Sequence, residues 1–155
     1  MTSPEGSTIT FRCSSAGIRP RALLLFARKL EREVSKGRPF DCLVTGDGEL
    51  RRLNREFRGK DEPTDVLSFP MSQDGPNGRS RPPLGDLAIS VARARSQARE
   101  FGHSTEQEIR VLMLHGVLHL MGMDHESDGG RMARAEKRWR SRLGLPNGLI
   151  ERVQS

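Results

Sequence analysis

The chain has 155 residues, of which 34% are hydrophobic and 30% charged, and this balance indicates one globular domain over residues 1–155 rather than a disordered chain. No apolar run approaches the ~20 residues of a membrane span, and the first residues lack a signal-peptide pattern, so we expect a cytoplasmic protein with no membrane partner. The formal net charge of +6 favours a polyanionic partner such as nucleic acid.

The N-terminal half alternates between strand-like and helix-like patterns. Residues 9–13 and 40–45 are predicted strands, and residues 19–34 between them carry apolar side chains at helical spacing. Asp47 is a plausible N-cap for a short helix that follows. Residues 66–69, bounded by prolines, are a third predicted strand.

The C-terminal half begins with a stretch rich in Pro, Gly, Ser and Asn over 72–83, which we expect to be a flexible connection. A fourth strand over 84–91 follows it, so two strands flank this loop like a hairpin. Three helices are predicted next: 92–101, one from Ser104 or Thr105 to Gly122, and one from Glu126 or Ser127 to Leu143. The fold class is therefore an α/β layered single domain, with a mixed four-stranded sheet and about five helices.

Three of the four histidines, His115, His119 and His125, fall within 11 residues. His115 and His119 are four residues apart on a predicted helix, so both imidazoles face the same side. Gly122 permits a turn that can bring His125 to the same point. Three imidazoles leave a fourth position open for water, as in catalytic zinc sites, so the pattern predicts one zinc ion per chain. Nickel or copper suits the same ligands, and the alternative is three structural histidines near a buried helix end.

The spacing of these histidines is that of the metzincin peptidases, His-Glu-x-x-His-x-x-Gly-x-x-His, and we expect a metzincin-like metal helix. Gly116, however, stands where those peptidases carry the glutamate that acts as general base. Peptide hydrolysis needs that base, whereas a metal and an arginine can stabilise a charged phosphodiester transition state without it. The excess of arginine over lysine fits phosphate contacts, and it fits genomic base composition equally well.

Three segments make the chain resemble the YbeY family of rRNA maturation factors, which are single-strand-specific metallo-endoribonucleases. They are HGVLHLMGMDH at 115–125, LNREFRGKDEPTDVLSFP at 53–70 and GDLAIS at 85–90. The resemblance implies zinc on His115, His119 and His125, and catalytic roles for Arg58, His115 and His119. It also implies single-stranded RNA as substrate, the 16S rRNA precursor at its 3′ end in particular, with the small ribosomal subunit as partner in a bacterial cytoplasm.

Two other functions stay open. The first is a metzincin-like metallopeptidase, which the missing glutamate and the basic charge disfavour. The second is a non-catalytic ribosome assembly factor whose zinc is structural. An open position for water on the metal would discriminate the second, because structural zinc normally has four protein ligands.

Several further polar residues lie near the motifs. Asp124 either orients an imidazole or caps the last helix. Asp86 is expected to be structural, in contact with the loop or the metal-bearing helix, and His103 to lie at a helix end or on the surface. Cys13 and Cys42 are expected to be reduced core residues. A polar turn that opens a buried strand, rather than direct substrate contact, is expected of Thr64, Asp65 and Ser68.

Overall fold

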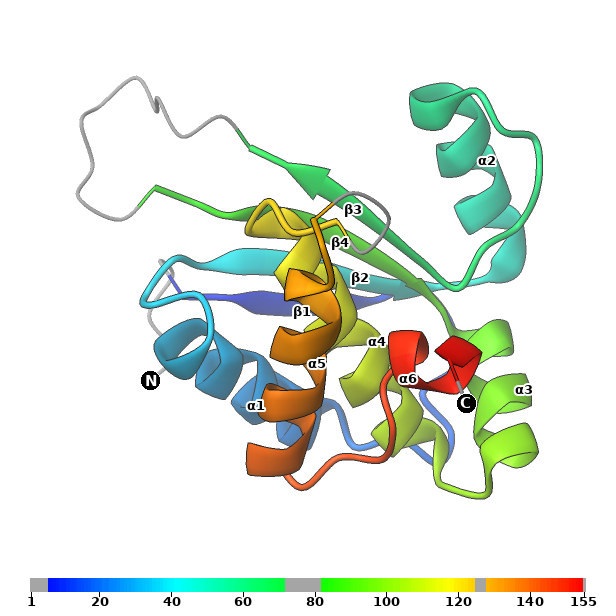
Figure 1. Ribbon diagram of the computed structural model, residues 1–155. Coiled ribbons are helices and arrows are strands. Elements are labelled where there is room, and N and C mark those ends of the chain that lie inside the picture. The colour runs from blue at the N-terminus through cyan, green and yellow to red at the C-terminus, as the bar shows by residue number, and fades with distance from the viewer. Residues whose placement is uncertain (1–5, 72–81, 125–127, 155) are drawn as a thin grey trace.

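A four-stranded mixed sheet forms the centre of the molecule, in a computed structural model that describes residues 6–71, 82–124 and 128–154. The strands are β1 (Thr8–Phe11), β2 (Phe40–Thr45), β3 (Val66–Pro70) and β4 (Gly85–Ser90). Their spatial order is β1-β2-β4-β3, with β1, β2 and β4 parallel and β3 antiparallel to β4 (Figure 1). The predicted mixed four-stranded sheet is confirmed, including the antiparallel pair on either side of the 72–83 stretch.

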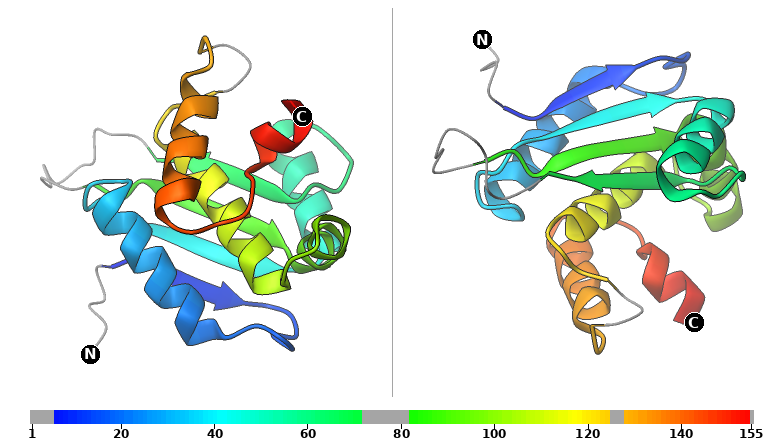
Figure 2. Two further views of the ribbon diagram at one scale, coloured as in Figure 1. Left: turned by 60° about the horizontal axis from the view of Figure 1, so that its bottom comes forward. Right: turned by 90° about the horizontal axis from the view of Figure 1, so that it is seen from above.

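Helices cover the two faces of the sheet unequally. Their bounds are α1 (Pro20–Glu33), α2 (Asp47–Arg58), α3 (Val91–Phe101), α4 (Thr105–Leu120), α5 (Arg131–Arg142) and α6 (Leu149–Gln154). Helices α1 and α4 pack on one face, with α5 and α6 outside α4, and α2 lies on the other face (Figures 1 and 2). The main hydrophobic core therefore lies between the sheet and α4, and a smaller cluster lies under α2.

Alternation along β4 decides which side chains reach α4. Leu87 points to α4, where it contacts Gly116. Its neighbour Ala88 points the other way and packs with Leu50 and Leu67 beneath α2. Successive side chains on a strand face opposite sides of a sheet, so Asp86 also lies on the α2 side.

Helix α4 is the most enclosed helix among the described residues, because twelve of its sixteen residues are buried. Its start is fixed by a capping box in which the Ser104 side chain accepts a hydrogen bond from the Gln107 backbone N–H and the Gln107 side chain accepts one from the Ser104 N–H. Ser104 was one of the two predicted caps. An apolar surface on all sides of a helix is typical of a central core element, and here that element carries two of the predicted ligands.

Three details differ from the prediction. Helix α6 was not predicted. Helix α5 begins at Arg131 rather than at Glu126 or Ser127, because Gly129 and Gly130 take left-handed backbone angles (φ 67° and 86°) that interrupt a helix. Asp47 is the first residue of α2 and not its N-cap, which is Gly46. Most of the predicted 72–83 loop lies outside the described residues.

Candidate metal centre

His115 and His119 lie side by side near the C-terminal end of α4. Their ring centroids are 4.8 Å apart and the rings meet edge to face, at 76°. His115 is 7% exposed, and His119 is partly exposed. The two predicted ligands therefore share one face of the helix, as their four-residue spacing requires.

Both histidines line a pocket of about 550 Å³. Its walls come from the end of α2, from β3, from α4 and from the turn after α4. The residues that line it are Arg58, Asp65, Val66, Ser68, Pro70, His115, His119, Gly122, Met123 and Asp124. Two parts of the chain that the sequence analysis singled out separately, 53–70 and 115–124, thus form one cavity.

Hydrogen bonds fix the orientation of both imidazole rings. The Nδ1 atom of His119 lies 3.0 Å from the carbonyl oxygen of Met123, and the Nδ1 atom of His115 lies 2.6 Å from Oε2 of Glu136. A carbonyl oxygen and an ionised carboxylate only accept, so both Nδ1 atoms donate. In a neutral imidazole with a protonated Nδ1, Nε2 carries the lone pair that binds a metal. The two rings therefore fit a metal ion bound through Nε2.

The turn after α4 explains how the chain returns to the pocket. Gly122 has a left-handed backbone (φ 92°), and its N–H donates to the carbonyl of His119. Met123 and Asp124 consequently line the pocket. His125, the third predicted ligand, lies outside the described residues, and the described ones alone contain no cluster of three metal-binding side chains. The three-histidine set stays a prediction.

Arg58 is the last residue of α2, and its exposed side chain lines the same pocket as the histidines. Gly59 ends the helix with a left-handed backbone (φ 70°), which a residue with a side chain adopts less easily. Asp65 and Ser68 line the pocket too, while the Ser68 hydroxyl donates to the carbonyl of Gly116 at 3.2 Å. Ser68 therefore makes a structural contact with α4, as expected, and also lines the pocket.

Glu136 was missed by the sequence analysis. It lies on α5, in a helix whose other charged residues are all basic, and it is 1% exposed. The signal was present in the helical spacing, because Met132 and Ala135 are also buried and place Glu136 on the same inward face. A carboxylate on the buried face of a helix requires a polar partner, and here the partner is His115.

Asp124, His103 and the two cysteines lie in different surroundings. Asp124 lines the pocket, and its two expected roles stay predictions. Asp128 accepts a hydrogen bond from the Met132 N–H in the first turn of α5. The side chain of His103 is 8% exposed and contacts Glu108, so its position after α3 was predicted correctly but a surface location is wrong. Cys42 is buried, whereas Cys13 is only partly buried.

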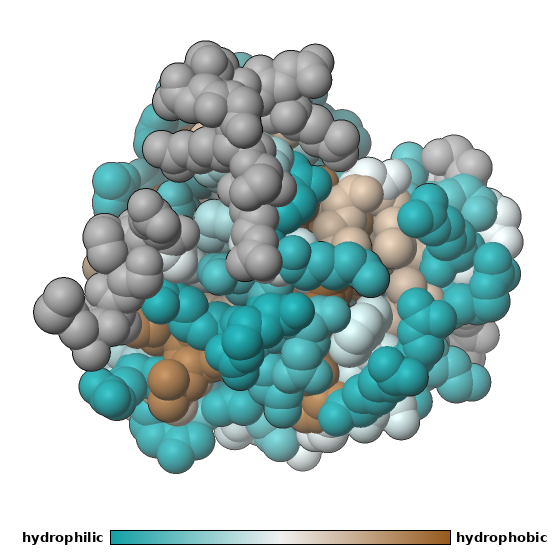
Figure 3. Space-filling model, turned by 90° about the vertical axis from the view of Figure 1, so that its left-hand side faces the viewer, coloured by the Kyte–Doolittle hydropathy of each residue, from teal (hydrophilic) through white to brown (hydrophobic). Residues whose placement is uncertain are grey.

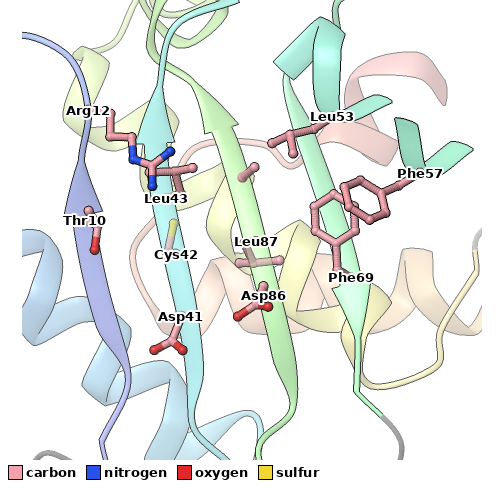
Figure 4. Close-up of a pocket in the computed structure, with 11 residues that line it drawn as sticks. Thr10, Arg12, Asp41, Cys42, Leu43, Leu53, Phe57, Phe69, Asp86 and Leu87 are labelled. Atoms are coloured by element: carbon pink, nitrogen blue, oxygen red, sulfur yellow. The ribbon is translucent and has the colours of Figure 1, made fainter. Parts of the chain in front are cut away.

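Asp86 lies on the opposite face of the sheet, in a groove beside α2 (Figure 4). Its strand neighbour in register is Asp41, and burial, together with that second carboxylate, raises the pKa of Asp86. The expected contact of Asp86 with the metal-bearing helix is therefore wrong, because side-chain alternation directs Leu87 to α4 instead. Phe57 and Phe69 close one side of the groove, with ring centroids 5.4 Å apart.

Comparisons with known proteins identify relatives of this chain. The family model described as "Endoribonuclease YbeY" matches residues 20–144. Proteins of that name from Solibacter usitatus and Koribacter versatilis are 65% and 47% identical to the chain. The first match covers 100% of both chains, and the second covers 89% of this chain and 86% of the relative. The solution structure of TM1509 from Thermotoga maritima superposes with a TM-score of 0.56 at 29% identity, over 87% of this chain and 92% of that one.

Proposed function

The chain belongs to the endoribonuclease YbeY family, and from that premise we propose that it is a zinc-dependent endoribonuclease specific for single-stranded RNA. The zinc ion would be held by His115, His119 and His125. The observation that carries this proposal is the pair of adjacent imidazoles, each with Nδ1 held by an acceptor, in the wall of a pocket that also contains Arg58.

Zinc bound there would polarise the scissile phosphate and lower the pKa of a bound water. The chain's own residues supply orientation and charge. Met123 and Glu136 hold the imidazoles in one tautomer, and the Arg58 guanidinium provides a cation that can grip two phosphate oxygens. Since a phosphodiester transition state is anionic, a preorganised cation beside it lowers the barrier.

Charge and surface character support RNA as the substrate. The net charge of +6 attracts a polyanion, and many hydrophilic side chains lie on the face shown in Figure 3. The pocket opens to solvent beside the two histidines, so a substrate has room to enter it. An enclosed structural zinc site has no such room. An unpaired RNA strand can bend its backbone into such a pocket more easily than a duplex can.

The biological substrate we propose is the 16S rRNA precursor at its 3′ end, processed on the small ribosomal subunit in the cytoplasm. This proposal rests on the resemblance in the 53–70, 85–90 and 115–125 segments. Among the described helices none is long and apolar enough to cross a membrane.

Substrate class is tested with three substrates. Two are the same labelled RNA sequence, once single-stranded and once annealed to its complement, and the third is a casein-like peptide. We expect cleavage of the single strand, much slower cleavage of the duplex and none of the peptide. RNA affinity should fall steeply as salt rises, since binding releases counterions. Peptide cleavage that disappears in a His115→Ala variant would instead favour the metallopeptidase.

A further inference from the structure

Glu136 connects the predicted metal ligand His115 to the C-terminal end of the chain. Its Oε2 atom accepts from His115 Nδ1 at 2.6 Å, and its Oε1 atom accepts from the backbone N–H of Ile150 at 2.9 Å. Both contacts are buried, and the side chain of Glu136 is 1% exposed. Each oxygen of one carboxylate therefore holds a different part of the structure.

We propose that Glu136 is a positioning residue for His115, and that the C-terminal segment (residues 145–154) holds Glu136 in the place where it can do so. This inference rests on the proposed metal site. A carboxylate that accepts from Nδ1 fixes the tautomer and the ring orientation of a histidine, and it makes the opposite nitrogen a better metal ligand. The Oε1 contact prevents the carboxylate from rotating away from the ring.

The C-terminal segment packs tightly on Glu136. A Cβ atom added at Gly148 would overlap Oε1 of Glu136, so the backbone of this segment lies directly on the carboxylate. The backbone of Gly148 is not left-handed, so its conformation does not require glycine. Glycine is needed here because a side chain would overlap Glu136. The segment thus encloses the side of the carboxylate that faces away from His115.

Two ion pairs fix α6 in this position. The Arg152 guanidinium donates two hydrogen bonds of 2.8 Å to the buried Glu108 of α4. Arg140 of α5 donates to Glu151 at 2.8 and 2.9 Å. The C-terminal segment is thus joined to both helices that carry the His115–Glu136 pair, so displacement of α6 would release Glu136.

The test measures zinc affinity by chelator competition in wild-type protein and in two variants, Glu136→Gln and Gly148→Ala. Glutamine has only one acceptor oxygen and cannot serve both His115 and Ile150, so we expect zinc affinity to fall by about 10–100-fold. Gly148→Ala, which leaves Glu136 intact but pushes on it, should weaken zinc binding by a smaller factor. Glu49→Gln and Gly48→Ala on α2 are the matched controls, since Gly48 has open space around it, and both should bind zinc as wild type does.

A second readout separates positioning from mere stability. Nitrogen NMR of the histidine rings in metal-free protein should show one Nδ1–H tautomer for His115 in the wild type and a mixture of tautomers in Glu136→Gln. A folded Glu136→Gln variant with wild-type zinc affinity and a single tautomer would overturn the inference and leave the proposed function standing. If Glu136→Gln does not fold, wild-type zinc affinity in Gly148→Ala overturns it. A wild-type protein that binds no zinc would overturn both proposals.

Discussion

Gly116 of α4 lies directly against Leu87 of β4, and a Cβ atom at position 116 would come within 2.6 Å of Leu87 Cδ2. The carbonyl of Gly116 also accepts a hydrogen bond from Ser68 of β3. The position at which metzincin peptidases carry their glutamate base is here a close helix–sheet contact. A larger residue there would push α4, with both histidines, away from the sheet.

Gly116→Glu should therefore destabilise the protein and not create a peptidase. We expect a loss of about 3–5 kcal/mol in unfolding free energy, because the new side chain would overlap the buried Leu87 and bring a carboxylate into this close helix–sheet contact. Thermal unfolding and a casein-like peptide assay measure the two effects. Gly48→Glu, at an exposed position of α2, should change stability by about 0.5 kcal/mol or less. A folded Gly116→Glu variant with peptidase activity would contradict this account.

Arg58→Ala should retain zinc and fold but lose most RNA cleavage. Removal of one preorganised charge-stabilising donor typically costs about 2.7–4 kcal/mol of barrier, which corresponds to roughly 10²–10³ in rate. Arg58→Lys should recover only part of the rate, because lysine cannot form the two-pronged contact with phosphate. The measurement is single-turnover cleavage of a single-stranded RNA at saturating enzyme, with zinc content determined on the same samples.

Arg55→Ala is the matched control for Arg58. Arg55 lies in the last turn of the same helix, but its side chain pairs with Asp61 at 3.7 Å and does not line the pocket. Its replacement removes the same charge from the same helix, so a general loss of RNA attraction would affect both variants equally. Equal rates for Arg58→Ala and Arg55→Ala would show that Arg58 acts only as a surface charge.

Acid sensitivity should depend on Glu106, at the start of α4. Hydrogen bonds from the Arg19 guanidinium and backbone N–H hold the pKa of this carboxyl down to about 2, from an ordinary 4.5. Because the folded-state pKa is depressed, the stabilisation is complete above about pH 5 and is lost as the pH falls toward 2. Glu106→Gln should cost about 1–2 kcal/mol at pH 7 and progressively less at lower pH.

Denaturant unfolding at pH 7, 5 and 3 checks this prediction. The wild-type free energy of unfolding should fall more steeply with acid than that of Glu106→Gln, and the two should converge near pH 2. Parallel curves over this range would show that the Arg19–Glu106 pair does not couple stability to pH.

Features that depend on short-range sequence patterns could be predicted from the sequence. The four-residue spacing of His115 and His119 predicts their common face, Gly122 predicts the end of α4, and the strand pattern predicts the antiparallel pair around the 72–83 stretch. These features depend on backbone geometry within a few residues. The resemblance, rather than any local pattern, singled out Arg58, which the fold places in the same pocket as the histidines.

Features that depend on tertiary packing were missed. Glu136 shares the helical spacing of the buried face of α5, but only the packing of α5 on α4 identifies His115 as its partner. Helix α6 is six residues long, too short to form without the contacts of Arg152 and Ile150 with the rest of the structure. Of the two contacts expected for Asp86, the one with the metal-bearing helix is wrong, because the strand pattern alone does not reveal which face of the sheet α4 covers.

The most direct test of the central claim is cleavage of a labelled single-stranded RNA by protein that has been stripped of metal and then titrated with zinc. The account predicts that stripped wild-type protein is inactive, that about one equivalent of zinc per chain restores cleavage, and that His119→Ala, although folded, neither retains zinc nor regains activity. Undiminished cleavage by the metal-free wild type, or by His119→Ala, would contradict a metal-dependent endoribonuclease centred on these histidines.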